Sequence, residues 1–273
     1  MSAETISAMV RRADPDRWLA ALFAPEPKRP HLLALYAFNI EIARVADTVR
    51  EPMMGEIRLE WWRETLAGAR AGKPRAHDTA RALADLFAAV GLPAELFEAM
   101  VAARSFDASS DLFADRAALE AYCDATSGNL MRLAARILGK PDDDLARAAG
   151  TAYAIAGMLR AIPHQVARHK SFLPQSLLDA VGLGKDALFV RHERDKVKAV
   201  VAQMAYWGRE HFAPARAARI GRAELPAYLP ASLVPLFLRR VTRPGHDPLS
   251  HTPDIPIHRR QLRLLVAAMR GRL

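Results

Sequence analysis

The 273 residues of the chain are half hydrophobic (51%) and carry a formal net charge of +9, which suits a large buried interior and an anionic partner. The charge alone does not choose between nucleic acid, anionic lipid and diphosphate substrates, but no zinc-finger, RNP or basic-zipper pattern is present, so we expect no nucleic acid partner. The single cysteine, Cys123, excludes an internal disulfide framework and a cysteine-based metal site, and it fits a reducing compartment.

Apolar residues recur at steps of three and four along most of the chain, and this spacing predicts helices. No stretch shows strand alternation bounded by hairpin turns. We therefore predict an all-α fold, a multi-helix bundle around one interior. The predicted helices, in chain order, span 17–24, 31–50, 53–70, 76–90, 93–104, 115–138, 142–162, a short segment ending near 182, 190–211, 224–241 and 257–270. Gly128 lies inside one of them at a cost of about 1 kcal/mol, which indicates a close helix approach or the edge of a ligand.

No low-complexity linker divides the chain, so we expect a single domain over 1–273, with 1–16 flexible. The N-terminal residues lack an apolar core followed by a cleavage site, so we expect no secretory signal. No apolar run approaches the roughly 18 residues of a transmembrane helix. These features lead us to expect a cytoplasmic protein, either soluble or peripheral at the inner membrane.

Residues 150–174 begin as an apolar helix and end in a basic cluster that includes Arg160, Arg168 and Lys170. Pro163 predicts a kink or an end of this helix, because its ring clashes with the preceding turn and it donates no hydrogen bond. The cluster therefore lies at a helix C-terminal end or a kink. It suits an anion-binding site, or equally a solvated helix end where cations interact favourably with the helix dipole.

Two pairs of carboxylates have helical spacing. Asp47 and Glu51 are one turn apart and share a face, so they could hold Mg²⁺, which prefers oxygen ligands. The alternative is a solvated helix end in which Arg50 forms ordinary ion pairs with them. Asp107 and Asp111 are also four residues apart, but they look like turn and cap residues.

Two C-terminal segments, 236–243 and 262–272, pair apolar residues with arginines. This composition is typical of helices that lie at a membrane surface, which would allow peripheral membrane contact. It also fits the last packing helices of a bundle, whose arginines extend into water.

Several motifs together resemble the squalene/phytoene synthase family. They are LYAF at 35–38, WWRE at 61–64, the YC and SG pairs within 122–128, and GMLRAIPHQVARHKSFLP at 157–174. The resemblance runs from about Trp18 to the C-terminus. It implies an isoprenoid synthase fold, in which helices surround a central cavity. It also implies an activity that joins two prenyl diphosphates head to head, with Mg²⁺ held between two aspartate-rich helices at the cavity mouth.

The sequence departs from the family pattern at these aspartates. In an alignment on LYAF, the first motif falls on 43–47 and keeps only its last carboxylate, with Glu51 as a substitute one turn later. In the second motif, alanine and glutamine replace both aspartates, while the basic residues remain. The candidate cavity mouth consists of Ala43, Asp47, Glu51, Ala161 and Gln165. The candidate metal ligands are Asp47 and Glu51, and the candidate diphosphate- or anion-binding residues are Arg160, Arg168 and Lys170.

Alanine cannot bind a cation, and a neutral glutamine does not offset the charge of Mg²⁺, so we expect metal-assisted ionisation to be lost or much reduced. The pattern ALYAFNIEIARV at 34–45 followed by EIRLEWWRE at 56–64 resembles a divergent branch of the family, which includes an assembly factor for respiratory complex I. This implies a non-catalytic protein that binds an isoprenoid diphosphate or other lipid-like anion, with a respiratory-complex protein as its partner. The alternative is an active, Mg²⁺-dependent head-to-head prenyl diphosphate transferase, with metal held by Asp47, Glu51 and Asp124.

Overall fold

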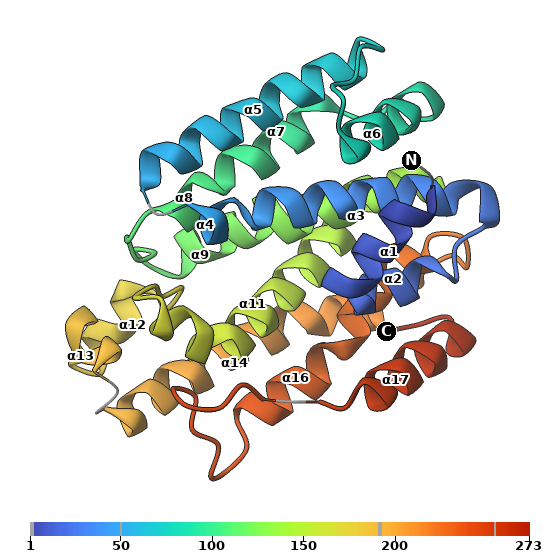
Figure 1. Cartoon of the computed structure of the whole chain (residues 1–273). Coiled ribbons are helices and arrows are strands. Elements are labelled where there is room, and N and C mark those ends of the chain that lie inside the picture. Colours follow the sequence, from blue (N-terminus) through green and yellow to red (C-terminus); the bar gives the residue numbers. More distant parts are fainter. Residues whose placement is uncertain (1–2, 50, 191–192, 254) are drawn as a thin grey trace.

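Every regular element in the described part of the chain is a helix, as Figure 1 shows. This computed structural model describes residues 3–49, 51–190, 193–253 and 255–273. The all-α prediction is therefore confirmed.

The helices fall into two consecutive groups along the chain. The first group is α1 (Ala3–Ala13), α2 (Pro15–Ala21), η1 (Glu26–Lys28), α3 (Arg29–Ala43), α4 (Val45–Thr48), α5 (Pro52–Arg70), α6 (Asp78–Ala89), α7 (Ala94–Ala103) and α8 (Ser105–Ala108). The second group is α9 (Arg116–Cys123), η2 (Asp124–Gly128), α10 (Asn129–Leu138), α11 (Asp143–Ala167), α12 (Gln175–Ala180), α13 (Lys185–Phe189), α14 (Arg194–Ala217), α15 (Leu225–Tyr228), η3 (Leu229–Leu233), α16 (Val234–Val241) and α17 (Ile257–Arg270).

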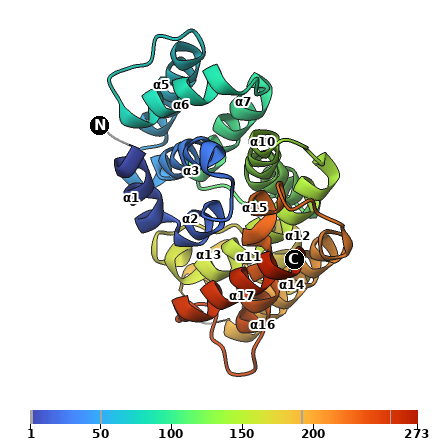
Figure 2. The same cartoon turned by 90° about the vertical axis from the view of Figure 1, so that its right-hand side faces the viewer.

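Helix α11 is the central element, because it contacts α10, α14, α16 and η2. Figures 1 and 2 show α5, α6 and α7 on one side of the molecule and α14, α16 and α17 on the opposite side, with α3 and α11 between them. The buried apolar side chains form one continuous cluster. Its largest fully buried members are Trp62, Tyr36, Tyr228, Phe38, Phe97 and Phe237. This core fixes α3 and α11 relative to each other.

Two N-terminal segments differ from the helices that the sequence predicts. Residues 3–13, within the segment expected to be flexible, form α1. Ile6 and Val10 lie one turn apart in α1 and are buried where it meets α3, so the segment is anchored by apolar packing. The predicted helix 31–50 is divided at Arg44 into α3 and α4, and its last residue lies outside the described residues.

Pro163 does not end α11, which continues to Ala167. The flanking Ile162 and Val166 are only 1% and 3% exposed, so packing on both sides of the proline outweighs the lost hydrogen bond. The basic cluster does lie at the C-terminal end of this helix, as the sequence predicts.

Two glycines allow α11 to pass close to η2, a five-residue π-helix within the predicted helix 115–138. A Cβ atom on Gly150 would lie 2.6 Å from the Cα and nitrogen atoms of Gly128 and 2.8 Å from the carbonyl carbon of Ser127. These are backbone atoms, which cannot rotate away from the added group. The predicted close helix approach at Gly128 is confirmed.

We expect Gly150→Ala to lower the free energy of unfolding by about 2 kcal/mol, because overpacking against the backbone outweighs the better helix propensity of alanine. Gly157→Ala, in the same helix, is the matched control. A Cβ there would meet no atom within 4 Å, so the free energy of unfolding of this variant should rise by roughly 0.5–1 kcal/mol. Urea unfolding of both variants measures the difference, and equal effects would contradict the close approach.

Candidate functional site

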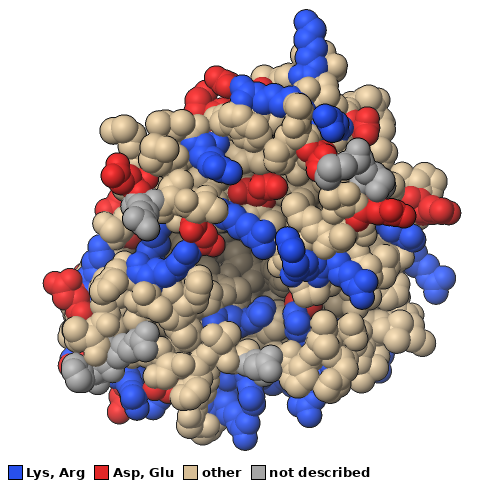
Figure 3. Space-filling view, in the orientation of Figure 1, with Lys and Arg blue, Asp and Glu red and all other residues tan. Residues whose placement is uncertain are grey.

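A cavity of about 330 Å³ lies between α3, α4 and α11. Figure 3 shows a hollow near the middle of this face, with lysine and arginine side chains around it. The volume is at the lower end of the range of about 300–1,000 Å³ that is typical of ligand pockets. The lining residues are Arg17, Asn39, Ala43, Ala46, Asp47, Arg104, Asp107, Tyr122, Thr126, Ser127, Tyr153, Ala154, Gly157, Met158, Ala161, His164, Gln165, Arg168, Lys170 and Phe172.

Four of the five residues that the sequence places at the cavity mouth do line this cavity. Ala43 and Asp47 come from the α3–α4 side, and Ala161 and Gln165 come from α11. Gln165 is buried, and its side-chain amide donates a hydrogen bond to the backbone carbonyl of Met158 at 3.2 Å. The structure therefore brings together the two segments, 43–47 and 161–165, that the sequence places at the cavity mouth.

Glu51, the fifth predicted mouth residue, is not among the lining residues. It is exposed and occupies the N-cap position of α5. Because α4 ends at Thr48 and Val49 has an extended backbone, Asp47 and Glu51 do not share one helix face. The shared face predicted for these two carboxylates requires a continuous helix through both, so that prediction is wrong.

An ion pair between Asp47 and Arg168 connects the two walls at the mouth. Arg168 also donates to the backbone carbonyl of Asp47 at 3.3 Å. Arg168 caps the end of α11, and His169 adopts a left-handed backbone with φ 54°. The amide of Lys170 then bonds back to the carbonyl of Gln165 at 2.9 Å, a closure typical of helix C-termini. This turn places the side chains of Arg168 and Lys170 at the cavity.

Arg160, which the sequence analysis assigns to anion binding, is not among the lining residues. Its guanidinium lies over the ring of Phe237 in α16, 3.9 Å from the ring centroid. One residue along an α-helix corresponds to a rotation of about 100°, so Arg160 points away from the wall on which Ala161 lies. The structure therefore brings Arg168 and Lys170 to the cavity and leaves Arg160 on another face of α11.

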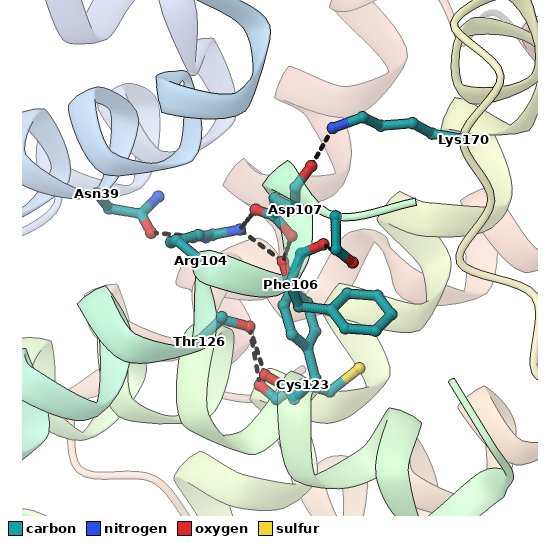
Figure 4. Close-up of polar contacts among 9 residues, drawn as sticks. Asn39, Arg104, Phe106, Asp107, Cys123, Thr126 and Lys170 are labelled. Carbon is teal, nitrogen blue, oxygen red and sulfur yellow. Dashed lines mark hydrogen bonds and ion pairs between the residues drawn. The ribbon is translucent and has the colours of Figure 1, made fainter. Parts of the chain in front are cut away.

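A buried polar network that the sequence analysis missed forms part of the lining. Arg104 donates to Asp107 Oδ2 at 3.0 Å and to the hydroxyl oxygen of Tyr122 at 2.8 Å, and the Tyr122 hydroxyl donates to Asp107 Oδ1. Figure 4 shows Asp107 between Arg104 and Lys170, whose ammonium donates to the Asp107 backbone carbonyl. Asp107 is thus a buried member of a network, not the turn or cap residue that its neighbourhood in the sequence suggests.

Burial and charge set the protonation of this network. Burial lowers the pKa of Arg104, but Tyr122 and Asp107 outweigh it and raise that pKa above the usual value, so the guanidinium stays charged. Burial raises the pKa of Tyr122 well above its usual value, so the phenol stays neutral. Burial lowers the pKa of Lys170, against the opposing effect of Asp107, and the nearby Arg168 lowers it further. Lys170 is therefore a partly desolvated cation next to the mouth.

A second arginine of the lining, also missed from the sequence, is buried and belongs to α2. Arg17 donates to Asp14 at 2.7 Å and to the hydroxyl oxygen of Ser127 at 3.3 Å. Its guanidinium lies 4.8 Å from the ring centroid of Tyr153. Burial lowers the pKa of Arg17, but Asp14 outweighs it, and the net pKa is raised. The cavity lining therefore contains two arginines with little solvent exposure, each paired with one aspartate.

The side chains at this cavity do not fit a Mg²⁺ site held from two walls. Mg²⁺ requires several oxygen ligands, usually with carboxylates among them, whereas α11 offers Ala161 and the neutral Gln165, and Asp47 is engaged by Arg168. Asp124, the third carboxylate considered, pairs with Arg132 at 2.7 Å and is not a lining residue. Within the described residues, no group of three or more histidine, cysteine or acidic side chains could hold a metal ion.

Comparison with known proteins agrees with this architecture. The family model for squalene/phytoene synthase matches residues 10–263. The chain is 27% identical over 244 residues to NADH dehydrogenase (ubiquinone) complex I, assembly factor 6 of Homo sapiens, which covers 88% of this chain and 73% of the relative. It is 29% identical over 204 residues to presqualene diphosphate synthase of Rhodopseudomonas palustris, which covers 72% of each chain.

A solved structure has the same fold. The crystal structure of a dehydrosqualene synthase in complex with ligand superposes with a TM-score of 0.83 and 18% sequence identity, over 98% of this chain and 95% of that chain. At this identity the similarity shows the fold alone, which confirms the predicted isoprenoid synthase type of bundle.

Proposed function

Because this chain belongs to the squalene/phytoene synthase family, we propose that it is a non-catalytic member that binds an isoprenoid diphosphate or other lipid-like anion in the cavity between α3, α4 and α11. The observation that carries this proposal is the composition of the two walls. Arg168 and Lys170 supply cations at the mouth, whereas Ala161 and Gln165 occupy the face of α11 that would need carboxylates to hold Mg²⁺.

The charged side chains on these walls support binding of an anionic ligand, but not the departure of its diphosphate group. Departure of a diphosphate group requires neutralisation of its developing charge, which metal ions supply in prenyl transfer. Lysine and arginine can hold a phosphate group through charge-assisted hydrogen bonds. The residues of α11 that line the cavity include no carboxylate, so nothing in the described lining anchors a metal ion from that side. We therefore propose that the chain binds the diphosphate but does not transfer the prenyl group.

The size of the cavity also favours a single ligand. Its volume of about 330 Å³ is near the lower limit for a pocket that encloses one small molecule. Head-to-head transfer requires two prenyl chains in one cavity. Apolar side chains such as Met158 and Phe172 could cover one hydrocarbon chain next to the basic mouth.

We extend the proposal to a role in the assembly of a respiratory complex, with a respiratory-complex protein as the partner. The support is the similarity, over most of the chain, to relatives named complex I assembly factor 6. In this role, a ligand bound in the cavity would stabilise the protein, because a ligand that binds only the folded state raises the free energy of unfolding.

The test combines binding and turnover on the purified full-length chain. We expect farnesyl thiodiphosphate, a slowly reacting analogue, to bind saturably in the presence of EDTA by calorimetry. We expect farnesyl diphosphate with Mg²⁺ to release no diphosphate above the buffer background. Release at roughly 1 per second or faster, a rate typical of enzymes, would instead establish the head-to-head transferase.

A pair of variants tests whether the ligand occupies this cavity. Lys170→Gln should weaken binding of the analogue about tenfold, which is the loss expected when one charge-assisted hydrogen bond is removed. Arg160→Gln removes the same charge from α11 at a position outside the lining, so it should leave the affinity unchanged within about twofold. Equal losses in both variants would show that only the overall charge matters, and would contradict binding at the mouth.

A further inference from the structure

Helix α17 packs against the bundle with one face only. Leu264 and Ala267 are buried, and Arg260 pairs with the buried Asp16 of α2 at 2.6 Å. Helix α17 contacts η3 and α2, and Figure 2 shows it on the outside of the molecule. The opposite face has no covering element among the described residues, so its side chains decide what this surface can contact.

The uncovered face of α17 carries large apolar side chains. Leu262, Leu265 and Met269 are 61%, 45% and 72% exposed, and their spacing of three and four residues places them in one row. None of the residues of α17 lines the cavity described above, so the row is not part of that pocket. An exposed apolar row on a helix that also carries basic residues is typical of helices that lie at a membrane surface.

A cluster of arginines lies beside this row. Arg263 is surrounded by Arg216 of α14, Arg239 of α16 and Arg270, and its side chain is held by a 3.0 Å hydrogen bond to the carbonyl of Ser232. Burial lowers the pKa of Arg263, and the three neighbouring arginines lower it further. In the described part of the chain, no carboxylate forms an ion pair with any of the four. The cluster therefore lacks a counter-charge.

We propose that α17 docks on an anionic lipid bilayer, with Leu262, Leu265 and Met269 inserted at the level of the headgroups and the arginine cluster against lipid phosphates. Amphipathic helices bind membranes in this way when an apolar face lies next to basic residues. Among the described residues, no helix has the length and apolar content needed to cross a bilayer, so the contact is peripheral. Helix α16 differs from α17, because its Phe237, Leu238 and Val241 are buried in the core.

The experiment is flotation of the full chain with vesicles of pure phosphatidylcholine, or of three parts phosphatidylcholine to one part phosphatidylglycerol. We expect binding to the anionic vesicles at low salt, release at high salt, and no binding to the neutral vesicles. A chain that stays unbound to both compositions overturns the proposal, and it would point to a protein partner for this face.

Two variants and two matched controls locate the contact. L262Q/L265Q/M269Q and R239Q/R270Q should each weaken binding to the anionic vesicles roughly tenfold. The controls make equal changes at exposed positions elsewhere, M53Q/M54Q/I57Q on α5 and R12Q/R58Q, and should bind as the parent chain does. Controls that lose as much binding as the α17 variants, or α17 variants that bind normally, overturn the proposal. Thermal unfolding of each variant shows whether it is folded.

Discussion

We expect the replacement of Arg104 by methionine to lower the free energy of unfolding by about 3–5 kcal/mol. The side chains of Arg104 and Asp107 are only 14% and 10% exposed, so each charge is stabilised mainly by the other and only weakly by water. Methionine fills much of the same space but leaves the Asp107 carboxylate buried without its cation. Urea unfolding at neutral pH measures the change.

Two further variants show whether the loss comes from the unpaired carboxylate. R104M/D107N removes both charges and keeps an acceptor for the Tyr122 hydroxyl, so it should be about 2 kcal/mol more stable than Arg104→Met alone. Arg63→Met breaks an exposed ion pair with Glu60 and should change stability by less than about 1 kcal/mol. A double variant no more stable than the single one would refute this account of the network.

The second large effect is expected from restoring carboxylates to α11. In A161D/Q165D, two acidic side chains four residues apart would line the cavity on the wall across from Asp47. Carboxylates there repel a diphosphate unless a divalent cation lies between them. We therefore expect binding of farnesyl thiodiphosphate by this variant to fall roughly tenfold or more when EDTA replaces Mg²⁺.

The parent chain and a neutral variant serve as controls for this experiment. A161N/Q165N has nearly the same shape without the charges, so its affinity should be equal in Mg²⁺ and EDTA, as in the parent chain. Calorimetry under both conditions gives the ratio for each protein. If the parent chain already needs Mg²⁺, the proposed metal-free binding is wrong.

The sequence predicts the parts of this molecule that local spacing determines. Helix α17 spans Ile257–Arg270, the range that the sequence predicts, and Ala161 and Gln165 share a wall because they are four residues apart. Arg160 shows the limit of a motif match. It occupies a basic position of the motif, but its rotation about α11 directs it to Phe237.

The parts that sequence could not predict depend on contacts between distant segments. Arg104 is the C-cap residue that follows α7, and its partner Tyr122 comes from α9, so no local pattern shows that they meet. The run ARSFD does place Arg104 and Asp107 three residues apart, a spacing that suits an ion pair, and this was the available signal. The end of α4 at Thr48 likewise separates Asp47 from Glu51, which an uninterrupted periodicity would have kept together.

The contact between Asp47 and Arg168 has a consequence for selectivity. In the proposed binding mode, a phosphate that approaches Arg168 competes with the Asp47 carboxylate, so uptake would exchange one counter-ion for another. Such an exchange yields little net Coulomb energy, because the guanidinium is neutralised before and after it. In the proposed binding mode, discrimination between ligands would then fall to their hydrocarbon parts, which would lie against Met158 and Phe172, and a free inorganic phosphate would compete poorly with a prenylated one.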